Sequence, residues 1–166
     1  MAAAKSQSRK RKTKRAASGK DAIALLKADH KEVKGMVEQF KKSRSESKKS
    51  DLAQQICAAL EVHAQIEEEI FYPAAREALK ANDGDLIDEA EVEHTSVREL
   101  VAKIKRGSSG DALWEAEVKV LGEFVNHHVK EEEGEIFPKV RKTRADLKAI
   151  GEQLAQRKAE LQGMQQ

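Results

Sequence analysis

Hydrophobic residues recur every three or four positions along most of this chain, which is the spacing of one face of an α-helix. The pattern predicts helices over residues 21–42, 51–81, 85–106 and 111–142, and a further charged helix over 145–161. Short segments rich in Ser, Lys, Asn, Asp and Gly separate the long helices. Four long helices joined by short loops predict an all-α, up-down-up-down four-helix bundle.

Each long helix carries one stripe of inward positions, which we expect to form the core. Apart from histidines, the stripe of the first helix consists of Ile23, Leu26, Val33, Val37 and Phe40, and that of the second of Leu52, Ile56, Ala59, Ile66 and Ile70. The stripe of the third helix consists of Ile87, Ala90, Val97, Val101 and Ile104, and that of the fourth of Trp114, Val118, Leu121, Phe124, Val125 and Ile136. We expect Asp51 to cap the second helix. We expect the final charged helix to dock weakly on the bundle or not at all.

Composition agrees with a helical protein that has highly charged outer faces. Charged residues make up 36% of the 166 positions and aromatic residues only 4%, and there are two prolines. The single cysteine, Cys57, excludes an internal disulfide framework and suits a reducing compartment. No apolar run approaches the roughly 18 residues of a transmembrane helix, and no secretory signal is recognisable, so a cytoplasmic location is expected.

Charge divides the chain into a basic tail and an acidic remainder. The first 20 residues hold eight basic side chains and no acid, namely Lys5, Arg9, Lys10, Arg11, Lys12, Lys14, Arg15 and Lys20. Since the whole chain has a net charge of +2, the remainder carries −6. We therefore expect residues 1–20 to be a disordered tail, 21–142 the bundle and 143–166 a charged helical extension. The tail could contact nucleic acid nonspecifically through its charge, or remain solvated.

Four of the five histidines lie one per long helix, near the middle of the inward stripe. They are His30, His63, His94 and His128. Glu67 follows His63 by four residues, and Glu132 follows His128 by four. Residues separated by four positions project from the same helix face, so both glutamates should also point into the core.

The same spacing occurs twice in the chain, which indicates an internal repeat. His30 and His94 are 64 residues apart, His63 and His128 are 65 apart, and so are Glu67 and Glu132. Pro73 and Pro138 follow the second histidine of each half by ten residues, and Arg76 and Arg141 by thirteen. The repeat fixes the register on the fourth helix: it selects His128 over His127 and Glu132 over Glu131.

Two ionised carboxylates in an apolar core are unfavourable without a partner, because burial costs several kcal/mol and like charges repel. A divalent metal would remove both problems, and imidazole with carboxylate suits iron, zinc or manganese. The alternative is that the glutamates turn outward and the histidines only make hydrogen bonds. We predict a two-metal centre held by the four histidines and two bridging glutamates.

Other polar residues near these positions are given structural roles. We interpret Tyr72 and Phe137 as packing residues and Cys57 as a core residue. We expect His127 to lie at the surface or just outside the ligand shell. The glutamates expected on a solvated face are Glu68, Glu69, Glu131 and Glu133.

These motifs resemble the hemerythrin-like, or HHE cation-binding, domain family. The resemblance rests on LLKADHKEV around His30, HAQIEEEIFYP from His63, EVEHTSV around His94 and HHVKEEEGEIFP around His128. It implies a non-haem di-iron centre, with metal ligands His30, His63, Glu67, His94, His128 and Glu132, that reacts with dioxygen or a related molecule such as nitric oxide. The set of four histidines and two glutamates differs from that of the oxygen-carrying members. A ferritin-like centre would need two Glu-x-x-His pairs, and the chain has one, Glu91 to His94.

Three functional hypotheses follow from different classes of protein. The first is a module that binds or senses dioxygen or nitric oxide, which we favour over a dedicated enzyme. The second is an enzyme-like role in peroxide consumption or iron–sulfur cluster repair. The third is a DNA-associated stress protein that uses the basic tail.

Overall fold

The architecture was analysed in a computed structural model that describes residues 19–165. It is all helical, and residues 19–165 contain no strand. In chain order the elements are α1 (Ala22–Lys42), α2 (Glu46–Ile66), the π-helical turn η1 (Glu67–Phe71), α3 (Tyr72–Leu79), the 3₁₀ turn η2 (Lys80–Asn82), α4 (Gly84–Arg106), α5 (Ala112–Glu131), the π-helical turn η3 (Glu132–Ile136), α6 (Phe137–Arg141) and α7 (Leu147–Met164).

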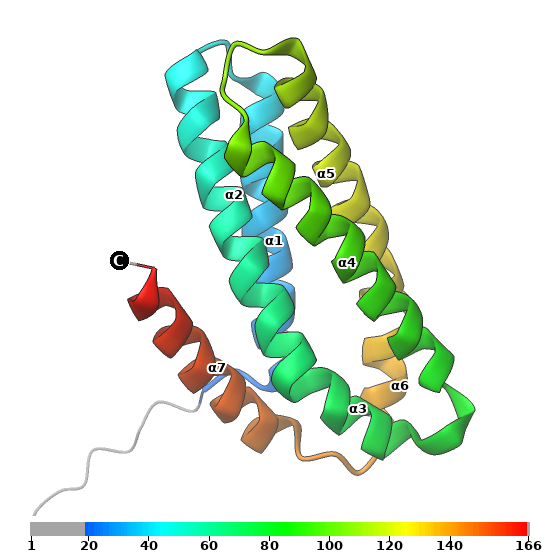
Figure 1. The fold of residues 1–166 in the computed structure, drawn as a ribbon. Coiled ribbons are helices and arrows are strands. Elements are labelled where there is room, and N and C mark those ends of the chain that lie inside the picture. The colour runs from blue at the N-terminus through cyan, green and yellow to red at the C-terminus, as the bar shows by residue number, and fades with distance from the viewer. Residues whose placement is uncertain (1–18, 166) are drawn as a thin grey trace, which may run out of the picture.

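Four antiparallel rods form the bundle: α1, the continuous run from α2 to α3, α4, and the continuous run from α5 to α6 (Figure 1). This confirms the predicted fold class. The expected disordered tail concerns residues 1–20, of which 1–18 lie outside the described residues. No helix among the described residues has the length and apolar character needed to span a membrane.

Capping side chains set the starts of the first two helices. Asp21 accepts a hydrogen bond from the Ala24 N–H at 2.8 Å, so α1 begins where the sequence predicts. The prediction that Asp51 caps the second helix is wrong, because Ser45 accepts from the Lys48 N–H at 3.2 Å and α2 begins at Glu46. The Ser/Lys-rich segment lacks an apolar stripe but contains no helix breaker, so a cap six residues earlier can start the helix.

The second long helix of each half, α2 and α5, widens at its end into a π turn that starts at an inward glutamate. In η1 the Tyr72 N–H donates to the Glu67 carbonyl, and in η3 the Phe137 N–H donates to the Glu132 carbonyl. A proline follows each of these two donors. Proline lacks an N–H and its ring clashes with the carbonyl four residues earlier, so the ladder must shift there, and a π turn absorbs the shift.

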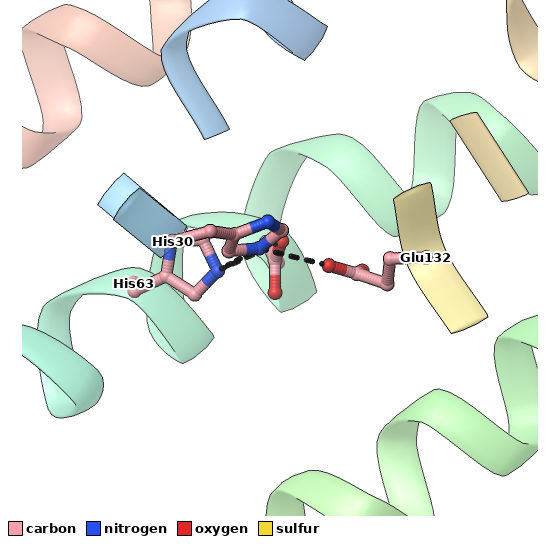
Figure 2. Close-up of side chains that lie close together, drawn as sticks. His30, His63 and Glu132 are labelled. Atoms are coloured by element: carbon pink, nitrogen blue, oxygen red, sulfur yellow. Dashed lines mark hydrogen bonds and ion pairs between the residues drawn. The ribbon is translucent and has the colours of Figure 1, made fainter. Parts of the chain in front are cut away.

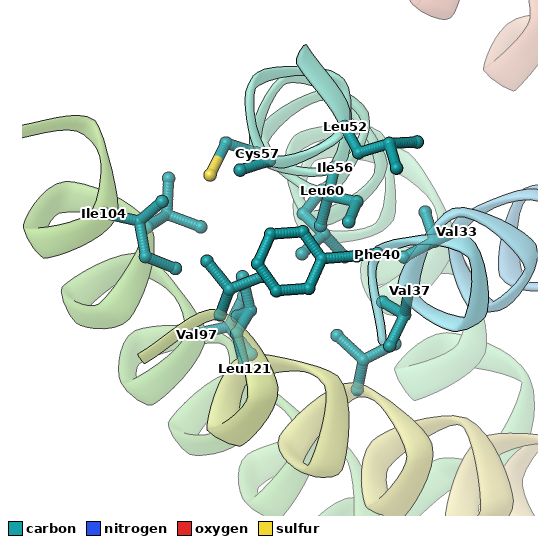
Figure 3. Close-up of a cluster of buried hydrophobic side chains, with 14 of the residues drawn as sticks. Val33, Val37, Phe40, Leu52, Ile56, Cys57, Leu60, Val97, Ile104 and Leu121 are labelled. Carbon is teal, nitrogen blue, oxygen red and sulfur yellow. The ribbon is translucent and has the colours of Figure 1, made fainter. Parts of the chain in front are cut away.

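The apolar core consists of two clusters, one at each end of the bundle. The first, drawn in part in Figure 3, gathers side chains such as Phe40, Ile56 and Leu121 at the end where α1 meets α2. The second gathers Leu26, Phe71 and others at the opposite end. Along each rod the inward histidine lies between residues of the two clusters, so the polar layer is enclosed by apolar ones.

Most predicted inward positions are buried, Ala59 and Ile70 are half-buried, and one is exposed for a geometric reason. Phe124 was expected in the core but is 42% exposed. Its neighbour Val125 is buried and continues the stripe that runs through Leu121 to His128. Adjacent helical residues point about 100° apart, so only one of the two can face inward.

The C-terminal helix α7 is docked, contrary to the weak or absent docking expected. It lies against α1, α2 and η1 (Figure 1). Leu154 is fully buried and Leu161 nearly so, and both belong to the second apolar cluster. The sequence obscured this contact because only two leucines and a glycine of α7 are buried, too few to give a strong helical stripe.

Gly151 marks the closest approach of α7 to the bundle. A Cβ atom at this position would lie 2.5 Å from the Lys20 carbonyl oxygen and 2.8 Å from the Ala22 nitrogen. Both contacts are backbone atoms, which cannot move aside as a flexible side chain can. The absence of a side chain here allows α7 to sit directly on the start of α1.

We expect Gly151→Ala to lower the free energy of unfolding by roughly 1–3 kcal/mol, because α7 must move away from α1. Gly163→Ala in the same helix is the control, since a Cβ there meets nothing within 4 Å. It should leave stability unchanged or raise it by up to about 1 kcal/mol, because alanine is the better helix former. Urea unfolding of both variants measures the difference, and equal effects would contradict the close contact.

Candidate metal centre

The four inward histidines and two glutamates meet at one place in the middle of the bundle. All six are buried, and Glu67 and Glu132 are 0% exposed. The histidines come from α1, α2, α4 and α5, and the glutamates from the π turns η1 and η3. The prediction that both glutamates point inward is therefore confirmed.

One group of side chains joins the first half of the chain to Glu132. The Nε2 atoms of His30 and His63 are 3.1 Å apart, and His30 Nε2 lies 3.2 Å from Glu132 Oε2 (Figure 2). His63 Nε2 lies 3.1 Å from Glu67 Oε1. These four side chains could hold a metal ion, since one ligand atom from each lies within 4.8 Å of the others.

A second group lies beside the first and shares its carboxylates. The Nε2 atoms of His94 and His128 are 3.1 Å apart, and His94 Nε2 is 3.1 Å from Glu67 Oε2. Glu132 Oε2 also lies 3.5 Å from His128 Nε2. Each glutamate thus reaches a histidine of both pairs, which is the arrangement that a bridging carboxylate requires.

The other ring nitrogen of every inward histidine faces a carboxylate outside this group. The pairs are His30 Nδ1 with Glu133 at 2.9 Å, His63 Nδ1 with Asp29 at 3.3 Å, His94 Nδ1 with Glu68 at 2.8 Å, and His128 Nδ1 with Glu93 at 2.6 Å. A carboxylate at Nδ1 holds the proton there and leaves the Nε2 lone pair free for a metal. All four imidazoles are therefore oriented as metal ligands.

These four outer carboxylates were missed as site residues in the sequence. Glu68 and Glu133 were expected on a solvated face; each is only partly exposed and holds a histidine instead. The signal was present in the internal repeat, because Asp29 and Glu93 directly precede the first histidine of each half. Glu68 and Glu133 directly follow the inward glutamates in the same way.

Burial and charge act in opposite directions on the histidines. Burial alone would lower the pKa of His63, but the Glu67 carboxylate and the Asp29 hydrogen bond raise that pKa to about 10. His128 is likewise disfavoured as a cation by burial, and Glu132 and Glu67 raise its pKa to about 11. Burial opposes ionisation of Glu67, yet the surrounding histidines hold its pKa well below the usual range. Glu67 thus stays ionised and attracts positive charge to the core.

The donor set fits divalent metal ions. Glu67 Oε1 and Glu132 Oε2 are buried without a hydrogen-bond partner, although each lies near imidazole nitrogens. Buried carboxylate oxygens are normally satisfied, so these two are suited to another electrophile. Neutral imidazole and carboxylate are ligands for iron, zinc and manganese.

Tyr72 and Phe137 occupy equivalent positions in the repeat but differ in function. Tyr72 was interpreted as a packing residue, yet its hydroxyl donates to Glu132 Oε1 at 2.8 Å and lies 3.2 Å from His94 Nε2. Burial and the two glutamates raise its pKa well above the usual value, so it remains a donor. Phe137 packs as predicted, stacked on the His30 ring with centroids 5.8 Å apart. The two sides of the centre are therefore chemically different.

The remaining residues near the site behave mostly as expected. His127 is 64% exposed and contacts Glu93 and Glu131 at the surface. Glu69 is exposed and pairs with Arg157 of α7. Cys57 is buried in the first apolar cluster, as predicted.

The roles of the two inward glutamates can be tested by substitution. Glu67→Ala or Glu132→Ala should lower the metal content sharply, because each carboxylate reaches a histidine of both pairs. His127→Ala is the control and should leave metal content unchanged, since this side chain points to the surface. Elemental analysis measures the ratio, and two ions per chain in both alanine variants would contradict the bridging role.

The stability of the metal-free protein should depend on pH. The folded-state pKa values of His63 and His128, about 10 and 11, exceed the unfolded value of about 6.5, so their stabilisation is complete below pH 6.5. It is lost as pH rises toward the folded pKa values, at about 1.4 kcal/mol per pH unit for each proton. The melting temperature of chelator-treated protein should fall from pH 7 to pH 9. A constant melting temperature would show that neither histidine holds a proton there.

Comparison with known proteins gives one family and one curated relative. The "DNA nickase" of Nostoc sp. (strain PCC 7120 / SAG 25.82 / UTEX 2576) is 28% identical over 118 residues, which cover 70% of this chain and 32% of that protein. The chain thus spans about a third of its relative's length. No solved structure matched. The family model described as Hemerythrin HHE cation binding domain matches residues 21–140, which include all six inward site residues. The chain therefore belongs to the hemerythrin HHE cation-binding domain family.

Proposed function

We propose that this protein holds two non-haem iron ions and binds, senses or reacts with dioxygen or a related diatomic molecule such as nitric oxide. The metal ligands in this proposal are His30, His63, Glu67, His94, His128 and Glu132. The observation that carries it is the pairing of six buried donor groups with an apolar cavity beside them. Membership of a cation-binding family supports the metal, and iron is its typical ion.

The cavity adjoins all four histidines and has a volume of about 20 Å³. A water-sized molecule needs about 10–15 Å³, so the space suits a diatomic molecule and excludes a larger substrate. Apart from Asp29 and the histidines, the lining is apolar: Val33, Leu60, Ala64, Val97, Val125 and Val129. Such a lining favours a small uncharged ligand over an ionic one.

The protein's own residues have three tasks in this proposal. Glu67 and Glu132 would bind the two metal ions through their carboxylates, and the outer carboxylates would hold each histidine's Nδ1 proton in place so that Nε2 can bind a metal. The Tyr72 hydroxyl keeps a donor beside Glu132. The apolar cavity excludes bulk water. When bound, two ferrous ions supply one-electron redox chemistry and coordination positions for a small molecule.

The ligand environment supports binding or sensing more than dedicated catalysis. Among the described residues that line the cavity, the ionisable groups are the four histidines and Asp29, and Asp29 is already paired with His63 and Lys158. No free acid or base is left there for proton transfer to a substrate. Peroxide consumption is the enzyme-like alternative, and it would be lost in Glu132→Ala.

The test of the metal proposal is elemental analysis with an absorption spectrum, on protein purified in air from iron-supplemented cells. Two irons per chain with near-ultraviolet ferric absorption are expected. Adding nitric oxide to the dithionite-reduced protein under argon should change the spectrum at one equivalent or more. A folded protein that binds no iron under any of these conditions would overturn the proposal.

Narrowing the cavity tests the ligand separately from the metal. Val129→Ile adds one methylene to the cavity wall and should slow nitric oxide binding about tenfold or more, with iron content unchanged, because the free space is barely larger than the ligand. Val118→Ile makes the same change in the first apolar cluster away from the cavity, so it is the control. Stopped-flow absorption measures both rates. Equal rates would mean that the ligand does not use this cavity.

Contact with DNA is a second candidate function. Its support is the name of the Nostoc relative, a DNA nickase, together with the eight basic residues among positions 1–20. We expect the full chain to bind duplex DNA without sequence preference and with affinity that falls steeply as salt rises, because phosphate contacts release counterions. Deleting residues 1–20 should abolish binding in fluorescence anisotropy. Unchanged binding by the shortened chain would exclude the tail as the contact.

A further inference from the structure

An acidic pocket opens beside the metal centre, between α4 and the run from α5 into η3. Its volume is about 70 Å³. Within residues 19–165, the pocket is bordered by five carboxylates and by no lysine or arginine. The carboxylates are Glu89, Glu93, Glu131, Glu132 and Glu135. A small space bordered by carboxylates concentrates cations and repels anions.

Glu132 borders both the pocket and the buried centre. It is 0% exposed, and its Oε2 atom has no hydrogen-bond partner and lies 3.2 Å from His30 Nε2 in the centre. The outer part of the pocket includes Glu93 and Glu131, which with the exposed His127 bring three ligand atoms within 4.8 Å of one another. A cation can therefore find donors at the outside and an unsatisfied carboxylate oxygen at the inside.

The internal repeat provides the comparison for this pocket. Positions equivalent to Glu89, Glu131 and Glu135 lie 64 or 65 residues earlier, and there the chain has Leu25, Ile66 and Ile70. The position of the proposed metal ligand is the same residue type in both halves, since Glu132 corresponds to Glu67. The three additional acids are thus specific to the second half and are not required to build the centre itself.

The equivalent face of the first half is closed. Leu25 and Ile70 pack with the buried Ile66 and with Leu154 of α7 in the second apolar cluster. Helix α7 lies along α1, α2 and η1 on this side (Figure 1). One side of the centre is therefore covered by the buried leucines of α7, and the other borders a pocket of carboxylates.

We propose that the acidic pocket is a transit site through which a divalent cation, ferrous iron in the proposed function, reaches the buried centre. In this proposal the cation first binds at the outer end of the pocket, to Glu93, His127 and Glu131. The charges of Glu89 and Glu135 attract it into the pocket. From there it binds Glu132, which is also a ligand of the buried centre. The inference rests on the proposed di-iron function. The inference predicts the rate at which the centre takes up metal. It does not predict a change in the amount of metal bound at equilibrium.

The test compares the rate of iron loading in two charge-matched variants. In Glu89→Gln/Glu135→Gln, two pocket charges are removed without touching a proposed ligand or Glu93, which holds His128. In the control Glu99→Gln/Glu123→Gln, two exposed charges are removed from the same helices, α4 and α5, outside the pocket. Metal-free full-length protein receives ferrous iron under argon, a ferrous chelator stops uptake at set times, and bound iron is measured after desalting.

We expect the pocket variant to load at least about fivefold more slowly than wild type at low salt, and the control at an unchanged rate. The difference should shrink at high salt, where charges are screened over a few ångströms. After long incubation all three proteins should hold two irons per chain. An unchanged rate in the pocket variant, or a lower final iron content, would overturn the transit role. Wild type that never binds iron would instead overturn the proposed function.

Discussion

Two buried glutamates at the centre of an apolar bundle are the constraint on which the rest of this structure depends. Glu67 and Glu132 have no exposed surface, and each has an oxygen without a hydrogen-bond partner. An unpaired buried carboxylate costs several kcal/mol, which is comparable with the whole stability of a domain of this size. Burial of these carboxylates therefore favours positive charge beside them in the folded chain. The raised pKa values of His63 and His128 indicate that protons can supply it when a metal does not.

The backbone accommodates this constraint through its two π turns. Each begins at a glutamate, and a proline lies six residues beyond that glutamate. The wider turn gives the two glutamates their place between the histidine layers without breaking the rod into separate helices. Apolar clusters on both sides exclude water from the layer. The carboxylates attract cations strongly because they lie close together and are shielded from water.

The sequence predicted the bundle and the inward register well because both depend on periodicity and on the internal repeat. His128 rather than His127 was selected by its distance from His63, and the exposure of His127 agrees with that choice. The outer carboxylates escaped prediction because glutamates such as Glu68 look like ordinary surface residues when only helix faces are considered. The docking of α7 escaped it too, since the close approach at Gly151 is a contact between distant backbone segments that no local pattern encodes.

The pairing of histidines with outer carboxylates also makes the two halves of the chain depend on each other. His63 and His128 are oriented from within their own half, by Asp29 and Glu93. His30 is oriented by Glu133 of the second half, and His94 by Glu68 of the first. Neither helical hairpin alone can hold both of its imidazoles in place. The chain is in this sense a covalently joined dimer of hairpins, in which each monomer completes the other.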